Sequence, residues 1–241
     1  MTPNIVIADI ETSPMELASF SLYPESIGHQ NILKDWFIIC AAWKSHGEKK
    51  VHAAKITKAG EDKAVVKQLR DALADADIIV GQNIAKFDIK KLNARLIYHK
   101  LPPLPLVPVV DTLKESKKIA SFSSHRLDYL GQHLIGEGKI DTTPGLWLKA
   151  MKGDKKAIAE MVRYNKVDVV RTEQLYDRIR PYIKSHPAMG VMMGVNAASC
   201  NCCGSVRLKK KGIRVSAAGR KRQEMQCLDC GHYQSMPITK L

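Results

Sequence analysis

The sequence predicts an α/β protein in which helices flank a mixed β-sheet, followed by a small cysteine-rich module. Three observations favour this fold class. An apolar segment lies close to the N-terminus at residues 5–12, short apolar segments then alternate with amphipathic helices up to residue 183, and five of the six cysteines lie between Cys200 and Cys230. A chain of 241 residues is long enough for one large domain and one small one.

The composition is that of an ordinary globular protein, at 45% hydrophobic residues, but the charge is not. The formal net charge of +14 points to a polyanionic partner, for which nucleic acid is the natural candidate. No apolar run approaches the length of a membrane span, and the N-terminus shows no basic and apolar leader. We therefore expect a cytosolic protein without a membrane partner, and a virus-encoded protein would fit the same observations.

The first element is the segment Ile5-Val6-Ile7-Ala8-Asp9-Ile10-Glu11-Thr12, which we interpret as a central strand. Side chains alternate between the two faces of a strand, so Asp9 and Glu11 point to the same side. Two adjacent carboxylates repel each other, and shared divalent cations allow both to stay ionised. The pair is therefore half of a candidate metal site. The alternative is a strand end with two solvated acids.

The next segments complete an antiparallel meander. Residues 13–34 have no clear periodicity and are expected to form a long loop near the site. Residues 36–43 and 50–54 are expected to form a hairpin. Apolar positions then recur at three and four residues over 62–76, as in an amphipathic helix, and a buried strand follows at 77–81.

The second half of this region alternates helices with one more short strand. A helix is expected over residues 83–99, and the proline-rich residues 101–108 form a connection to a strand at 109–110. Asp111 is a candidate N-cap of the helix that follows, and we leave it out of the site. Further helices are expected at 127–134 and 153–183.

Two more acidic positions fall where this layout brings them to the first pair. Asp88 follows the strand that ends at Gly81, at the sheet edge where ligands of α/β folds gather. Asp168 lies on the long helix, and Tyr164 precedes it by four residues on the same face. Three separate segments that each offer an acid, with a phenol at helical spacing, favour a shared catalytic site over chance.

These residues resemble the motifs of a known family. The sequence is similar to the DEDD 3′–5′ exonucleases of the ribonuclease H-like superfamily, in the subclass that uses a tyrosine. Asp9-Ile10-Glu11-Thr12 looks like their first motif, Asn83-x-x-x-Phe87-Asp88 like their second and Tyr164-x-x-x-Asp168 like their third. The likeness is strongest to the proofreading domain of family B DNA polymerases, and it covers about residues 5–183. The histidine subclass would place a histidine at the position of Arg163.

An intervening segment adds to this resemblance. Ser124-His125-Arg126-Leu127-Asp128-Tyr129-Leu130, followed by Gly136-Glu137-Gly138-Lys139, is similar to a stretch between the second and third motifs of those enzymes.

The resemblance implies a two-metal mechanism with two magnesium or manganese ions. Asp9 would bridge both ions, Glu11 and Asp168 would complete the first, and Asp88 would hold the second mainly through water. Tyr164 would orient the attacking water, because a phenol is a poor base at neutral pH. Two weaker candidates for substrate binding are Asn83 and Phe87, and the alternative for Phe87 is an ordinary core position.

The cysteines near the C-terminus have the spacing of a zinc site. Cys200-x-x-Cys203-Gly204 and Cys227-x-x-Cys230-Gly231 are matched knuckles, which predict one structural zinc. Cys202 is outside this pattern. Short strands are expected at residues 206–208, 213–216 and 223–226, so the module resembles a zinc ribbon that depends on its metal for stability.

The ribbon region is strongly basic. From residue 196 to 241 there are nine Lys or Arg against Glu224 and Asp229, a difference of nine minus two, or +7. Six of the basic residues are expected in turns that contact nucleic acid: Lys209, Lys210, Lys211, Arg220, Lys221 and Arg222. The alternatives are solvated hairpin tips or a surface that docks a polymerase or another replication protein.

We therefore expect three parts: an exonuclease domain at 1–184, a linker at 185–198 and a zinc ribbon at 199–241. The expected function is metal-dependent 3′–5′ hydrolysis of single-stranded DNA ends in replication, repair or recombination, by an enzyme that acts alone or as a separate subunit. An exoribonuclease, or a nuclease for duplex or structured ends, is an alternative because the same acids serve all of these. The alternative from another class is a non-catalytic binding or assembly module that uses the ribbon.

Overall fold

A computed structural model describes residues 2–24, 26–136, 143–195 and 197–238. The strands are β1 (Ile5–Thr12), β2 (Glu16–Leu17), β3 (Ile32–Lys34), β4 (Ile38–Ser45), β5 (His52–Lys55), β6 (Ile78–Gly81), β7 (Val109–Asp111), β8 (Leu208–Val215), β9 (Lys221–Cys227) and β10 (Tyr233–Pro237). The helices are α1 (Lys63–Ala74), α2 (Asp88–Tyr98), α3 (Thr112–Ile119), α4 (Leu127–Ile135), α5 (Pro144–Met151), α6 (Lys155–Ile179) and α7 (Met189–Met192), with short 3₁₀ turns η1 (His29–Asn31) and η2 (Arg180–Tyr182).

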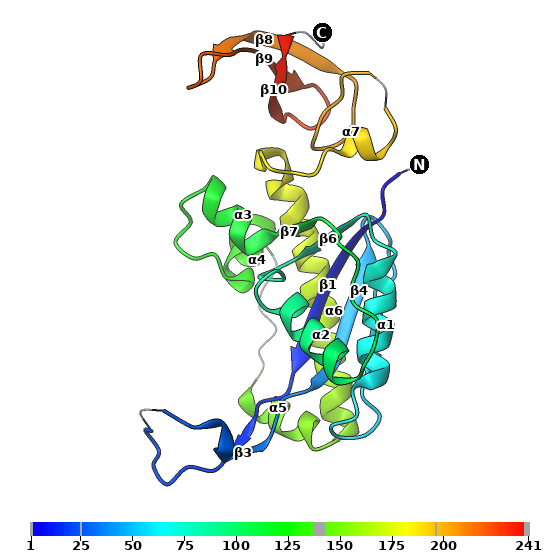
Figure 1. Ribbon diagram of the computed structural model, residues 1–241, viewed down its shortest axis with the longest axis vertical. Coiled ribbons are helices and arrows are strands. Elements are labelled where there is room, and N and C mark those ends of the chain that lie inside the picture. Colours follow the sequence, from blue (N-terminus) through cyan, green and yellow to red (C-terminus); the bar gives the residue numbers. More distant parts are fainter. Residues whose placement is uncertain (1, 25, 137–142, 196, 239–241) are drawn as a thin grey trace.

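The main sheet has five strands in the order β5-β4-β1-β6-β7, with β1 at its centre. β4 pairs antiparallel with both β1 and β5, whereas β6 pairs parallel with β1 and with β7. The predicted meander and mixed sheet are therefore confirmed. Helices α1 and α2 lie on one face of the sheet and α6 runs along the other (Figure 1).

The alternation of β1 explains where its acids point. Val6, Ala8 and Ile10 pack into the core on one face, whereas Ile5 and Ile7 pack into the core that includes the C-terminal half of α6. Asp9 and Glu11 continue the second series, so both carboxylates face α6. The register between β1 and β4 shifts between Glu11 and Thr12, which ends regular pairing at this edge.

Residues 13–34, expected as a loop, form a hairpin-like arm between β1 and β4. β2 pairs antiparallel with β3 through Glu16–Lys34 and Leu17–Ile32. The pairing is too short to give a periodicity signal in the sequence. In Figure 1 the arm is the dark blue segment that extends away from the body beyond the end of β1.

The predicted helix at 83–99 begins only at Asp88. Asn83 has a φ of +60°, a left-handed conformation that asparagine tolerates and that a helix cannot contain. The segment before Asp88 is therefore a turn. Of the stretch that resembles the family between its motifs, Glu137, Gly138 and Lys139 lie outside the described residues.

The C-terminal module is a three-stranded antiparallel sheet in the order β10-β9-β8. The strands predicted at 206–208 and 213–216 are replaced by the single strand β8, and the third strand, β10, was not predicted. The expectation that Lys209, Lys210 and Lys211 form a turn is wrong, because they lie within β8. Arg220 follows the β8–β9 turn, whereas Lys221 and Arg222 begin β9. Lys240 lies outside the described residues.

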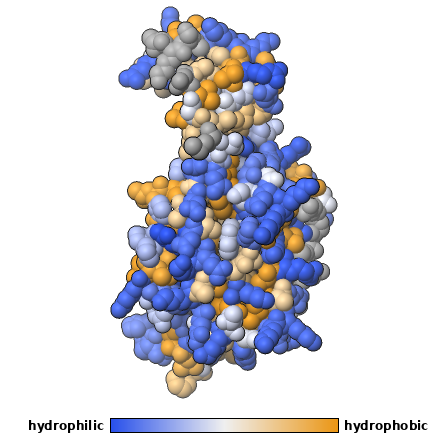
Figure 2. Space-filling model, turned by 90° about the vertical axis from the view of Figure 1, so that its right-hand side faces the viewer, coloured by the Kyte–Doolittle hydropathy of each residue, from blue (hydrophilic) through white to orange (hydrophobic). Residues whose placement is uncertain are grey.

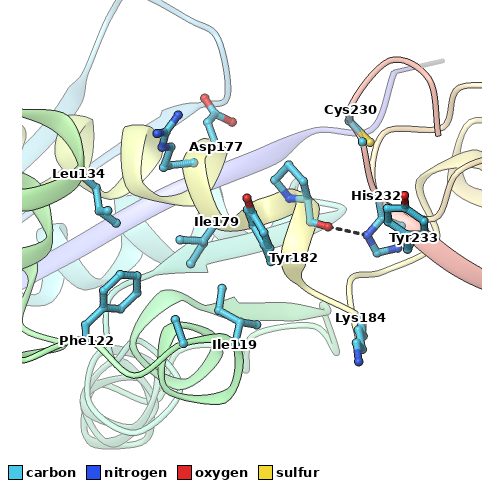
Figure 3. Close-up of a pocket in the computed structure, with 14 residues that line it drawn as sticks. Ile119, Phe122, Leu134, Asp177, Ile179, Tyr182, Lys184, Cys230, His232 and Tyr233 are labelled. Carbon is cyan, nitrogen blue, oxygen red and sulfur yellow. Dashed lines mark hydrogen bonds between the residues drawn. The ribbon is translucent and has the colours of Figure 1, made fainter. Parts of the chain in front are cut away.

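The ribbon contacts the body at the C-terminal end of α6. The guanidinium of Arg180 donates to the carbonyl of Cys202 at 3.0 Å. Nδ1 of His232 donates to the carbonyl of Pro181 at 2.8 Å, which is the dashed line in Figure 3. The segment expected as a linker, 185–198, includes α7, whose Met189 is buried. Figure 2 shows a narrow waist between the ribbon and the larger body.

In the described part of the chain, no helix is both long and apolar enough to cross a membrane.

Candidate metal-dependent active site and zinc site

The two acids of β1 meet a third acid from α6. Ligand atoms of Asp9, Glu11 and Asp168 all lie within 4.8 Å of one another. α6 presents Asp168 there because its buried positions, such as Asn165 and Val169, recur along the face that packs on the sheet. Carboxylate oxygens gathered in this way suit magnesium or manganese.

Asp88 lies beside this group of three rather than within it. It begins α2 directly after the turn that follows β6, and it is only 6% exposed. Its Oδ1 accepts a hydrogen bond from the backbone amide of Ile10, between Asp9 and Glu11, at 3.1 Å. The fourth acid is thus fixed against the strand that carries the first two.

Among the residues that the structure describes, the cluster holds several buried or half-buried carboxylates and only one nearby positive side chain, Arg171. Burial, followed by the charge of Asp88, raises the pKa of Asp9 well above its ordinary value. Burial, followed by the charge of Asp168, raises the pKa of Glu11 to about 8, and burial raises that of Asp88 to about 7. Arg171 lies 3.7 Å from Asp168. Divalent cations would supply the positive charge that keeps these carboxylates ionised.

Tyr164 lies one turn before Asp168 on α6, and its hydroxyl hydrogen-bonds the Asp168 carboxylate. Burial, followed by the charge of Asp168, raises the pKa of the phenol above its ordinary value. The hydroxyl therefore stays protonated at neutral pH and acts as a hydrogen-bond donor. This suits an orienting role and disfavours a role as general base.

Two contacts to the cluster come from Asn165 and Trp147, neither of which the sequence predicted as a site residue. Asn165 is fully buried, and its Nδ2 donates to Oδ2 of Asp9 at 2.5 Å. Trp147 donates from Nε1 to Oε2 of Glu11 at 3.2 Å, and its ring meets that of Tyr164 edge to face at 6.2 Å between centroids. Asn165 could have been noticed as the neighbour of Tyr164, but α5, which carries Trp147, was not predicted.

Asp111 caps α3 as expected and has a second role. Its side chain accepts from the amide of Lys114 at 3.1 Å, and also from the amides of Asn83 at 3.1 Å and Ala85 at 3.2 Å. These contacts hold the turn that leads to Asp88. Asn83 thus contributes a left-handed backbone and an amide to the turn, and its role in substrate binding remains a prediction.

Phe87 is not an ordinary core residue. It is 38% exposed next to Asp88. Lys91, one turn further along α2, places its Nζ 5.6 Å from the centroid of the Phe87 ring and 3.5 Å from that of Trp36. These three residues form a cation–aromatic group at the edge of the candidate site, where either nucleobases or phosphates could be bound.

Four cysteines form the second candidate metal site. Sulfur atoms of Cys200, Cys203, Cys227 and Cys230 all lie within 4.8 Å of one another, and two of their pairs are 3.6 Å apart. Tetrahedral zinc–sulfur bonds of about 2.3 Å imply separations of about 3.8 Å, so this donor set fits zinc.

The knuckles point backbone amides at these sulfurs. The amides of Cys202 and Cys203 point at the sulfur of Cys200, and those of Asp229 and Cys230 at that of Cys227. Gly204 and Gly231 have φ values of +80° and +76°.

Cys202 lies outside the four-sulfur group. Its thiol contacts the carbonyl of Arg180 at 3.5 Å, so this cysteine lies in the interface between the ribbon and the body.

The acids lie beside the middle of α6, whereas the ribbon contacts its C-terminal end. Asp168 and Ile179 are eleven residues apart, or about 16 Å along a helix. A hollow of about 820 Å³ lies where the ribbon meets α3, α6 and η2, and none of the four acids lines it (Figure 3).

Comparison with known proteins assigns the chain to a superfamily. The family model of the RNase H superfamily matches residues 27–180, so the chain belongs to that superfamily. The match includes Asp88, Tyr164 and Asp168 but begins after Asp9 and Glu11. Membership supports a nuclease-type function that uses divalent metal ions.

A solved structure agrees with this assignment. The chain is similar to the family B DNA polymerase from the hyperthermophilic archaeon Pyrobaculum calidifontis, with a TM-score of 0.59 and 17% identity over 74% of this chain and 25% of that chain. The likeness shows a shared fold, and this chain spans only a quarter of that polymerase chain. No curated protein matches the sequence.

Proposed function

We propose that this protein is a metal-dependent 3′–5′ exonuclease that hydrolyses phosphodiester bonds at single-stranded DNA ends. The observation that carries the proposal is the convergence of Asp9, Glu11 and Asp168 within 4.8 Å, with Asp88 fixed to the same strand. The superfamily assignment supports a nuclease, and the tyrosine one turn before the last aspartate supports the 3′–5′ class.

In this proposal the four acids hold two magnesium or manganese ions. When bound, the ions would activate water, orient the scissile phosphate and stabilise the attacking and leaving oxygens. Asp9 and Glu11 hold their carboxylates side by side because β1 alternates, and Asn165 and Trp147 fix their orientations by single hydrogen bonds. Tyr164 keeps its proton, which it donates to Asp168, and its oxygen would accept a hydrogen bond from the water and so position it.

We assign these functions to the expected domains, with the exonuclease at residues 1–184, a connecting segment at 185–198 and the ribbon at 199–241. Cys200, Cys203, Cys227 and Cys230 would hold one structural zinc. The ribbon would bind the strand upstream of the cleaved end or dock a replication protein. Its basic residues on β8 support nucleic acid, because most of that strand is exposed.

The proposal is tested by incubating the purified protein with single-stranded DNA, duplex DNA and RNA of one sequence, each labelled at its 5′ end. Reactions contain magnesium, manganese or neither. We expect stepwise shortening of single-stranded DNA from its 3′ end only when metal is present. Faster cleavage of RNA would instead identify an exoribonuclease. Binding of the strands without cleavage under any of these conditions would identify a non-catalytic module.

A further inference from the structure

The arm formed by residues 13–34 is the most exposed apolar part of the described chain. Phe20, Leu22 and Tyr23 each have at least 91% of their surface exposed. Five further large apolar side chains of the arm are also exposed: Met15, Leu17, Ile27, Ile32 and Leu33. A short two-stranded hairpin is at best marginally stable alone, and exposed apolar groups of this size mark binding surfaces. The arm is therefore expected to have a binding partner.

The charge of the arm indicates what kind of contact it makes. Residues 13–34 contain Glu16, Glu25 and Lys34, a net charge of −1 in a chain of net charge +14. A segment that binds phosphates would be basic. Apolar and aromatic side chains without positive charge are instead suited to the flat faces of unpaired nucleobases.

The position of the arm links it to the acidic site. The arm begins at Ser13, two residues after Glu11. The amide of Ser13 donates a hydrogen bond of 2.9 Å to the carbonyl of Phe37, so the chain that leaves the arm comes back beside the end of β1. At its other end the chain enters Trp36, which Lys91 contacts at 3.5 Å beside Phe87 and Asp88. The root of the arm thus lies between the first two acids and the cation–aromatic group.

We propose that the arm stacks on unpaired bases of the strand whose end enters the acidic site, with Phe20 and Tyr23 as the stacking rings and Leu22 as an apolar contact. This inference rests on the proposed nuclease function. Stacking on one aromatic ring contributes about five- to 150-fold to affinity per base and does not depend on sequence.

The test compares two variants of the full-length protein. The arm variant combines Phe20→Ala, Leu22→Ala and Tyr23→Ala. The control variant combines Ile97→Ala and Leu106→Ala, which also remove exposed apolar side chains but lie outside the arm. Fluorescence anisotropy measures binding to a single-stranded oligonucleotide and to the same backbone without bases, with calcium in place of magnesium, across a salt series.

We expect the arm variant to bind the normal oligonucleotide at least tenfold more weakly, with an unchanged salt slope because no phosphate contact is lost. It should bind the base-free strand as the wild type does. The control should match the wild type on both strands. Equal binding of the normal oligonucleotide by the arm variant would overturn the proposal and favour a protein partner for the arm. An equal loss on both strands would also overturn it.

A small substrate separates failure of this inference from failure of the proposed function. A nitrophenyl ester of a single nucleotide is too short to reach the tip of the arm, so the wild type and the arm variant should hydrolyse it equally with manganese. Hydrolysis of this ester by neither protein would count against the nuclease. Equal hydrolysis combined with equal oligonucleotide binding would count against the arm alone.

Discussion

The Nδ2 group of Asn165 donates a hydrogen bond to Oδ2 of Asp9 across 2.5 Å, from α6 to the central strand. Asn165 has no exposed surface, so this contact fixes the carboxylate from inside the protein. A residue that orients a metal ligand in this way typically contributes ten- to a hundredfold to metal affinity or activity.

We expect Asn165→Ala to weaken manganese binding about tenfold or more while leaving the protein folded. Isothermal titration with manganese measures this directly, without relying on turnover. Asn93→Ala, at an exposed position of α2, is the matched control and should bind manganese normally. Unchanged manganese affinity in Asn165→Ala would show that the amide serves packing alone.

Tyr164→Phe should slow hydrolysis without abolishing it. The change removes a hydroxyl that donates to Asp168 and would position the water, and orienting groups of this kind contribute on the order of a hundredfold to ten-thousandfold. Single-turnover rates at saturating single-stranded DNA measure the effect. Tyr182→Phe, an exposed tyrosine near the ribbon, should have no effect, and the same result for Tyr164→Phe would exclude the proposed role.

The pKa of Glu11, raised to about 8 by burial and the charge of Asp168, predicts a pH-dependent stability without magnesium or manganese. Between the unfolded pKa of about 4.5 and the folded value, the folded protein binds more protons than the unfolded one, so its stability falls as pH rises. Glu11→Gln removes the titrating carboxyl group and with it this loss of stability. The variant should therefore exceed the wild type in stability increasingly from pH 5 to pH 8.

Urea unfolding at both pH values measures this difference. Glu160→Gln, an exposed position on α6, should show no such trend. Magnesium should stabilise the wild type at pH 8 more than Glu11→Gln, because the variant has lost a ligand. A constant difference between the variant and the wild type across this pH range would contradict the proposed environment of Glu11.

Two adjacent cysteines are expected to differ in whether they bind zinc. Cys203 lies in the four-sulfur group, whereas Cys202 contacts the carbonyl of Arg180. We expect one zinc per chain in the wild type and in Cys202→Ser, and loss of zinc with an unfolded ribbon in Cys203→Ser. Elemental analysis of the purified proteins decides the question. Loss of zinc from Cys202→Ser would mean that the ligand set is wrong.

The basic residues of strand β8 should bind the substrate strand at a distance from the acidic site. Changing Lys209, Lys210 and Lys211 to Gln should weaken binding of long single strands and reduce the salt slope by up to about 2, since each lost phosphate contact contributes about 0.7. Strands of about four nucleotides should bind as before, because the ribbon begins about 16 Å along α6 from Asp168. The control changes Lys49, Lys50 and Lys55 to Gln, which removes the same number of positive charges outside the ribbon. An identical loss of affinity in this control would mean that net charge alone causes the effect.

The sequence predicted those parts of the fold and site that depend on local pattern. The alternation of β1 placed Asp9 and Glu11 on one face, the helical spacing joined Tyr164 to Asp168, and the knuckle spacing selected four cysteines. The turn before Asp88 was not predicted, because it depends on Asp111, a residue 23 positions away whose side chain accepts its amides. Trp147 and the pairing within the arm likewise depend on contacts between distant segments.

The account is tested most directly by the product ladder of a 5′-labelled single-stranded DNA incubated with magnesium and either the wild type or Asp9→Ala. We predict products shortened one nucleotide at a time from the 3′ end by the wild type. Asp9→Ala should yield none, although it should stay folded and at least as stable, since one of several repelling carboxylates has been removed. A folded Asp9→Ala protein with the wild-type rate, or products cut from the 5′ end, would contradict the account.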